Sequence, residues 1–182
     1  MEEEKREKLG QEISACILKN ITELEKAMAR DCLDYGQLTR QEKENLIDEW
    51  LFFFLFRVDM LLFNNFDKDD RVSIKEIILH SVFAPLHQMY DREKVIEIIK
   101  RSLDRFSEYV EVYKKRNRQI DVYSSLKKHL AEINMVILEG TEGPKNALYS
   151  FLVQKNAEDA LTKEVRAIIQ DSKQARSNRS ID

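Results

Sequence analysis

Residues 50–66 read WLFFFLFRVDMLLFNNF, the most apolar stretch of the chain. Six of the nine phenylalanines lie here, and from Trp50 to Phe63 apolar side chains fall on nearly every side of a helix. A helix that is apolar all round must be surrounded by other helices. We therefore predict a helix over residues 40–65 at the centre of a bundle, with its aromatic rings filling the thickest part of the core.

The composition favours a purely helical protein. The chain has 182 residues, enough for one domain with a substantial core, but only 4 glycines and 2 prolines. Strand-rich folds need these residues at frequent turns, whereas helix interiors exclude them. We predict an all-α domain of six or seven helices over residues 1–172. The polar end of the chain, residues 173–182, is predicted to be a disordered tail.

Local signals predict where the other helices begin and end. Apolar residues spaced by three and four indicate a first helix over about residues 3–30. Capping boxes open helices at Thr39–Glu42 and Ser73–Glu76, Pro85 ends or kinks the third helix, and Asp91 caps the fourth. The fourth helix carries the apolar stripe Val95, Ile99, Leu103, Phe106, Val110 and Tyr113.

The second half of the chain is harder to divide. A single helix over residues 91–139 would be roughly 73 Å long, so we favour a break near 116–120. Gly140 is a suitable stop, and Pro144 a suitable first residue of a new helix. Two helices over about 145–155 and 157–172 complete the predicted bundle.

Three charged residues lie within or just before the apolar segment. Arg57 and Asp59 point about 200° apart on a helix and cannot pair with each other, whereas Asp59 shares a face with Asp48. Because an unpaired charge is costly in a core, Arg57 and Asp59 should each find a partner on another helix or reach an edge or cavity. The alternative is that Arg57, Asp59 and Asp48 line a polar pocket.

Residues 65–76, NFDKDDRVSIKE, resemble an EF-hand calcium loop. Asn65, Asp67 and Asp69 fall on ligand positions 1, 3 and 5, Ser73 on position 9, and Glu76 on the bidentate position 12. The glycine of position 6 is replaced by Asp70. The resemblance implies calcium ligation by Asn65, Asp67, Asp69 and Glu76. A capping box supplies the same serine and glutamate, which is the competing interpretation.

A second metal hypothesis rests on Glu76 and His80, one helical turn apart on one face. Helical bundles bind metals through glutamate and histidine, but they also need matching carboxylates on facing helices, and no Glu-x-x-His motif occurs here. Apart from calcium, no cofactor is predicted.

Several classes of function are not favoured. The net charge is −3, and we interpret the basic run KKRNR at 114–118 as a solvated face, so neither nucleic acid nor a membrane surface is an expected partner. No stretch of 18 uncharged apolar residues is present for a membrane span. Cys16 and Cys32 would lie roughly 24 Å apart on one helix, so two free thiols indicate a cytoplasmic protein.

No recognisable catalytic motif occurs in the sequence. The leading hypothesis is a non-enzymatic, cytoplasmic helical bundle that acts through protein–protein contacts and forms a homodimer. The alternatives are a calcium-responsive helical protein and a bundle with a small-molecule or metal pocket.

Overall fold

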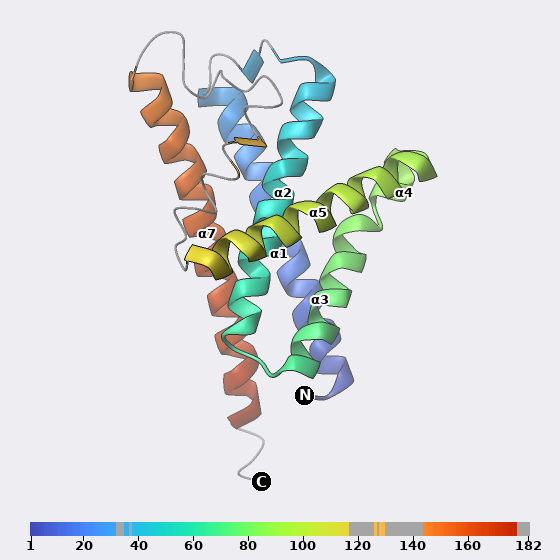
Figure 1. The fold of residues 1–182 in the computed structure, drawn as a ribbon. Helices are drawn as coiled ribbons and strands as arrows, with labels where there is room; N and C mark the ends of the chain where they lie inside the picture. Colours follow the sequence, from blue (N-terminus) through green and yellow to red (C-terminus); the bar gives the residue numbers. More distant parts are fainter. Residues whose placement is uncertain (32–34, 37, 117–125, 127, 130–143, 178–182) are drawn as a thin grey trace.

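The computed structural model describes residues 1–31, 35–36, 38–116, 126, 128–129 and 144–177. All regular structure in these ranges is helical (Figure 1), so the all-α prediction is confirmed. None of the helices there has the length and apolarity that crossing a bilayer requires. The helices are α1 (Glu3–Asp31), α2 (Arg40–Phe63), α3 (Lys68–Phe83), α4 (Leu86–Met89), α5 (Arg92–Arg116) and α7 (Pro144–Ser177).

Helix α2 is the centre of the bundle, as its apolar sequence predicts. The seven consecutive residues Trp50–Phe56 are all buried, so no side of this segment faces water. Helices α1, α3, α5 and α7 all pack against it. Edge-to-face aromatic contacts order this core: the ring centres of Trp50 and Phe53 are 5.7 Å apart, and those of Phe53 and Tyr109 are 6.0 Å apart.

Helix α1, at the N-terminal end of the described chain, packs against α7, at its C-terminal end. It packs against α3 on one side and α7 on the other, and α1 and α7 lie side by side in opposite directions (Figure 1). The predicted stripe of α1 is buried, with Ile13 and Ile17 fully enclosed. Val165 and Ile169 supply the matching buried face of α7.

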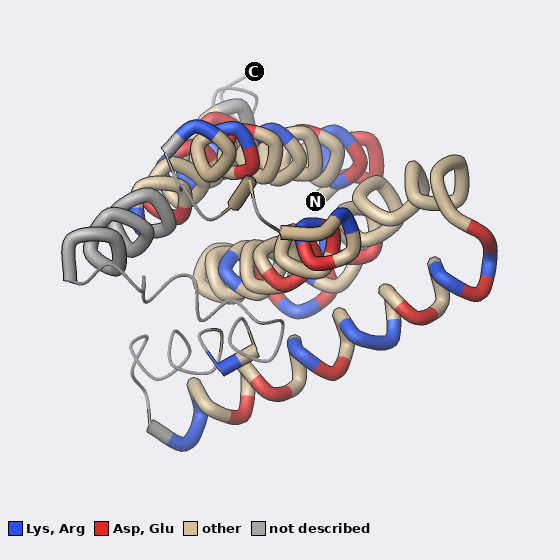
Figure 2. The backbone as a smooth tube through the Cα atoms, turned by 90° about the horizontal axis from the view of Figure 1, so that it is seen from above, with Lys and Arg blue, Asp and Glu red and all other residues tan. Residues whose placement is uncertain are grey.

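Helix α5 lies on the outside of the bundle and crosses α2 obliquely (Figures 1 and 2). The predicted core-facing stripe is confirmed except at one position: Val95 is buried, the half-buried Ile99, Phe106, Val110 and Tyr113 pack against the core, and only Leu103 is exposed, at 56%. Ile98, Ser102 and Tyr109, next to this stripe on the helix, are also buried, so the buried face of α5 is wider than the stripe.

Capping side chains explain where three helices start. Thr39 and Glu42 form the predicted capping box of α2, and Asp91 Oδ1 accepts a 2.8 Å hydrogen bond from the Lys94 amide at the start of α5. The predicted box at Ser73–Glu76 is wrong. Asp67 caps α3 instead, accepting a 2.9 Å hydrogen bond from the Asp70 amide, so Ser73 and Glu76 lie inside the helix.

Two further boundaries concern Pro85 and the end of the chain. Helix α3 ends at Phe83, before Pro85, as predicted. The predicted pair of helices over 145–155 and 157–172 is wrong, because α7 is one helix with no glycine or proline after Pro144 to interrupt it. Residues 173–177, predicted as part of a disordered tail, belong to α7 as far as Ser177. The predicted break near 116–120 and the stop at Gly140 lie outside the described residues.

Gly10 lets α1 and α3 approach closely. A Cβ atom placed on Gly10 would lie 2.6 Å from Ile77 Cγ2 and 2.8 Å from Ile77 Cβ. The second atom is attached directly to the backbone of α3, so a rotamer change cannot move it away. A side chain at position 10 therefore has to push the two helices apart.

We predict that Gly10→Ala destabilises the fold by about 1–2 kcal/mol, because overpacking outweighs the roughly 1 kcal/mol by which alanine favours a helix. Urea unfolding of both proteins measures this difference. Gly36→Ala is the control, since no atom lies within 4 Å of a Cβ at position 36. A Gly10→Ala protein as stable as wild type would show that the helices can separate freely.

Candidate functional site

The three charged residues of α2 predicted from the sequence each have an oppositely charged partner on a different helix. The pairs are Arg57 with Glu158 of α7, Asp59 with Lys75 of α3, and Asp48 with Arg101 of α5. The expectation that Arg57 and Asp59 find partners on other helices is therefore confirmed. The three residues point to three different neighbours and do not line one common pocket.

The ion pair of Arg57 and Glu158 joins α2 to α7 and is almost completely buried. Arg57 Nε lies 2.6 Å from Glu158 Oε1, and the two side chains are only 14% and 6% exposed. The Nε–H direction does not meet hydrogen-bond geometry, so the contact is chiefly ionic. Burial raises the pKa of Glu158 despite the opposing charge of Arg57. This pair fixes α7 against the central helix.

Asp59 and Lys75 lie beside a small apolar cavity between α2, α3 and α5. Lys75 Nζ is 3.3 Å from Asp59 Oδ1 and 3.6 Å from the centre of the Phe106 ring, so the ammonium group contacts both a carboxylate and an aromatic face. The cavity has a volume of about 40 Å³. Its walls are mostly apolar and include Phe52, Leu55, Val58, Leu62, Ile78, Leu79, Leu103 and Phe106.

The most enclosed charge lies at Glu49, at the start of the apolar segment of α2. The residue is fully buried. Arg101 Nη2 donates to Glu49 Oε1 at 3.1 Å, and Arg105 Nε donates to Glu49 Oε2 at 3.0 Å. Both carboxylate oxygens are thus held by charge-assisted hydrogen bonds from two arginines one turn apart on α5. We call Glu49, Arg101 and Arg105 the arginine clamp.

Asp48 and Asn45 extend the arginine clamp toward the surface. Arg101 Nη1 lies 3.3 Å from Asp48 Oδ2 and 3.4 Å from Asn45 Oδ1, and its guanidinium carbon lies 5.6 Å from the centre of the Phe52 ring. Burial raises the pKa of Asp48 to about 6, and the positive charge of Arg101 opposes that rise. One guanidinium therefore serves two carboxylates and compensates Asp48 only in part.

Two polar atoms beside this region have no hydrogen-bond partner. They are the hydroxyl of Tyr109 and the indole nitrogen of Trp50, both buried. Burial, with the negative charge of Glu49, raises the pKa of Tyr109. The phenol therefore stays neutral, and both residues act mainly as apolar filling of the α2–α5 contact.

The four residues of the predicted calcium loop are not brought together around one point. Asn65 donates to the Leu61 carbonyl at 2.8 Å and accepts from Lys173 Nζ at 2.8 Å. Asp67 is the cap of α3, and Glu76 lies well inside that helix. Nine residues of helical rise separate Asp67 from Glu76, about 13 Å, whereas calcium ligands share one ion at about 2.3–2.6 Å.

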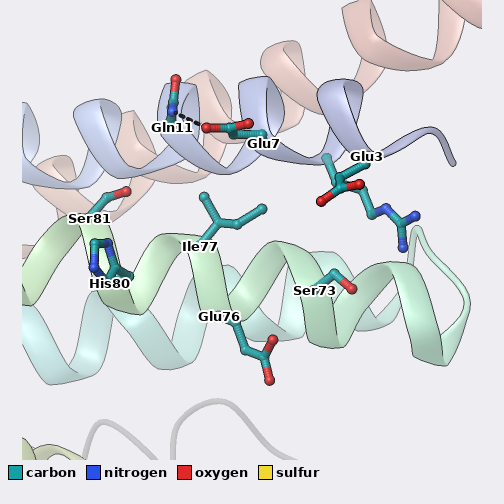
Figure 3. A pocket seen from close by; sticks show the side chains of 9 residues that line it. Glu3, Glu7, Gln11, Ser73, Glu76, Ile77, His80 and Ser81 are labelled. Carbon is teal, nitrogen blue, oxygen red and sulfur yellow. Dashed lines mark hydrogen bonds between the residues drawn. The ribbon is translucent and has the colours of Figure 1, made fainter.

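Glu76 and His80 both line a wide surface groove between α1 and α3 with a volume of about 730 Å³. Figure 3 shows Ile77 pointing toward α1, whereas the Glu76 carboxylate points away from it. Glu7 of α1, which also lines the groove, is hydrogen-bonded to Gln11. Among the described residues no three histidine, cysteine or acidic side chains are grouped to hold a metal ion.

Cys16 is a free, buried thiol that contacts the other end of the chain. Its sulfur lies 3.4 Å from Glu164 Oε2 on α7. Burial and the neighbouring Glu164 carboxylate raise its pKa to about 12, so the thiol stays protonated at neutral pH. This is a packing cysteine without the thiolate character that nucleophilic catalysis requires. Cys32 lies outside the described residues.

Sequence reasoning missed Glu49 and both of its arginines. Glu49 is the last residue of the charged run KENLIDE (43–49) and resembles one more surface residue. A usable signal was its helical phase, because Glu49 shares a face with Phe52, Phe53 and Phe56. A second signal was the four-residue spacing of Arg101 and Arg105 beside the apolar stripes of α5.

We predict that Glu49→Ala destabilises the protein by about 3 kcal/mol, because it removes the buried carboxylate that accepts a charge-assisted hydrogen bond from each of two partly buried arginines. Chemical denaturation measures the loss. Glu23→Ala is the matched control, since Glu23 and its partner Lys26 are both exposed and their pair should contribute almost nothing to stability. Equal effects of the two substitutions would show that the arginine clamp does not hold α5.

We predict that Asp48→Asn makes folding more favourable at pH 8 by about 2 kcal/mol. Burial raises the pKa of Asp48 to about 6 in the folded protein, so the protonated, neutral side chain favours folding below about pH 4. This contribution to stability is lost as the pH rises through 6 and the buried side chain becomes charged. The advantage of the variant should therefore disappear at pH 4. Urea unfolding of both proteins at pH 4, 6 and 8 tests this, and a difference that does not change with pH would refute it.

No protein-family model, no curated protein and no solved structure matches this chain. The candidate site is therefore defined by the contacts, burial and charges of the described helices. Its main parts are the arginine clamp, the small cavity next to Asp59, and the solvent-facing side of α5.

Proposed function

We propose that this chain is a non-enzymatic helical scaffold that works through protein–protein contacts and self-associates. The observation that carries the proposal is the exposure of Leu103. This side chain is 56% exposed, although it belongs to the apolar wall of the cavity between α2, α3 and α5. A large apolar side chain at the mouth of an apolar depression is typical of a protein-binding surface.

A second exposed side chain extends this surface along α5. Ile96 is 41% exposed and lies seven residues before Leu103, so both project from the same face of the helix. Single exposed apolar residues are common on protein surfaces and carry little meaning. Two at this spacing, with half-buried Ile99 and Phe106 on the same face, form a continuous apolar strip. Such a strip favours a helical protein partner.

The rigidity of α5 also supports a binding role. The arginine clamp holds one side of the helix, and the ring of Tyr109 packs between those of Phe53 and Phe56 at 6.0 and 5.5 Å. A surface held in place before binding loses little conformational freedom on association. The exposed strip is thus presented by a helix that is already fixed.

The site geometry gives less support to the other candidate functions. The cavity of about 40 Å³ is far smaller than the roughly 300–1,000 Å³ typical of small-molecule pockets. Asn65, Asp67 and Glu76 are engaged in other contacts or separated along α3, which does not favour a calcium-responsive role. We place the protein in the cytoplasm, where a protonated thiol such as Cys16 stays reduced.

We predict that the purified protein has the mass of a dimer, about 43 kDa for a chain of 21.6 kDa, in light scattering at micromolar concentration. Leu103→Lys should weaken the dimer at least tenfold, since it places a charge in the apolar strip. Leu18→Lys on α1 is the matched control, because Leu18 is also exposed, at 37%. A wild-type protein that stays monomeric at 100 μM would contradict the proposed function.

A further inference from the structure

The apolar cavity between α2, α3 and α5 reaches the surface beside Leu103. This residue belongs to the cavity wall and is 56% exposed. Helices α3 and α5 are joined through α4 and spread apart from it (Figure 1). Both pack on α2, so α2 forms the floor of the cavity and the other two helices form its sides. A group from outside can therefore enter the cavity between α3 and α5.

The cavity suits one apolar side chain better than water or a polar ligand. Its volume is about 40 Å³, whereas a single water needs roughly 10–15 Å³ of such space. The polar groups of its wall are already engaged. Ser102 Oγ donates to the Ile99 carbonyl at 2.8 Å, and Asp59 Oδ1 lies 3.3 Å from Lys75 Nζ. Water would find few partners there, whereas the end of a leucine or isoleucine would be enclosed by apolar atoms.

Three basic side chains surround the mouth of the cavity. Lys75 forms part of its wall and is 32% exposed, so its ammonium group reaches solvent as well as Asp59. Arg71 lies one helical turn before Lys75 on the same side of α3. On α5, the exposed Lys100 lies three residues before Leu103 and so projects next to it.

The neighbouring acidic side chains do not cancel these charges at the mouth. Glu76, next to Lys75 in the sequence, lines the separate groove between α1 and α3. Asp104, next to Leu103, points roughly 100° further round α5. In a chain with a net charge of −3, the mouth is thus a local basic surface around an apolar cavity.

We propose that this cavity receives one aliphatic side chain from an acidic peptide segment of a partner protein, whose carboxylates contact Arg71, Lys75 and Lys100; this deepens the protein-binding role proposed above and rests on it. A side chain enclosed in a pocket supplies much of the binding energy at protein interfaces. Charges at the rim mainly select the partner and speed its association. Recognition therefore needs both the apolar anchor and the flanking carboxylates.

Fluorescence anisotropy at low salt tests this site with three labelled ten-residue peptides. The first has one central leucine flanked by aspartates and glutamates. The second has lysine in place of every acidic residue, and the third has serine in place of the leucine. The acidic leucine peptide should bind at least tenfold more tightly than either of the others, and 0.5 M salt should weaken its binding. Equal affinity for the acidic and basic peptides, or no binding of the acidic peptide at 200 μM protein, would overturn the proposal.

Single substitutions locate the contact. Lys100→Glu should bind the acidic peptide about fivefold more weakly than wild type and the basic peptide more tightly, a gain that loss of folding does not produce. Lys115→Glu is the matched control, because it makes the same charge change on α5 twelve residues beyond Leu103. Leu103→Ser should weaken both leucine peptides, whereas Leu18→Ser on α1 should weaken neither. Equal effects of Lys100→Glu and Lys115→Glu would show that the acidic peptide binds elsewhere.

Light scattering of the same samples separates this site from the proposed self-association. A monomeric wild type that binds the acidic peptide with the expected preference supports the site and refutes self-association alone. A dimer that shows no preference for the acidic peptide refutes the site and leaves self-association standing.

Discussion

The buried carboxylate of Glu49 sets the position of α5, and with it the outer surface of the molecule. A charge enclosed among aromatic rings is tolerated only when both of its oxygens are hydrogen-bonded. Arg101 and Arg105 meet that condition from successive turns of α5. Their bonds fix how far this helix is rotated about its axis and where along its length it crosses α2. The rotation places Tyr109 in the core and leaves Ile96 and Leu103 exposed.

The same principle orders the rest of the bundle. A segment such as Trp50–Phe56, buried on every side, attracts neighbouring helices but does not orient them, because hydrophobic contact is non-directional. Arg57 selects Glu158 on α7, and Asp59 selects Lys75 on α3. Each of these neighbours of α2 is therefore tied to it by an ionic contact in addition to apolar packing. The charges within the most apolar segment give the bundle its register.

Local sequence patterns predicted some features well and others poorly, for identifiable reasons. The apolar core helix and its capping box at Thr39 depend on residues close in sequence, so both were predictable. Asp67 was missed as a cap because Ser73 and Glu76, six to nine residues later, have the spacing of a capping box. The same spacing supplies two of the positions in the resemblance to a calcium loop. The partners of Arg57, Asp59 and Glu49 depend on helix rotation within the bundle. No spacing rule within one helix contains that information.

The pairing of α1 with α7 has a consequence for how the chain folds during synthesis. Lys19 contacts Glu164, 145 residues later, and the buried face of α1 includes Ile13 and Ile17. The ribosome makes α7 long after α1, at about 5–20 residues per second. The apolar face of α1 therefore waits several seconds for its partner, with a high contact order that slows the final step of folding. During that interval α1 can already pack against α2 and α3, and only the part of its face that contacts α7 stays uncovered.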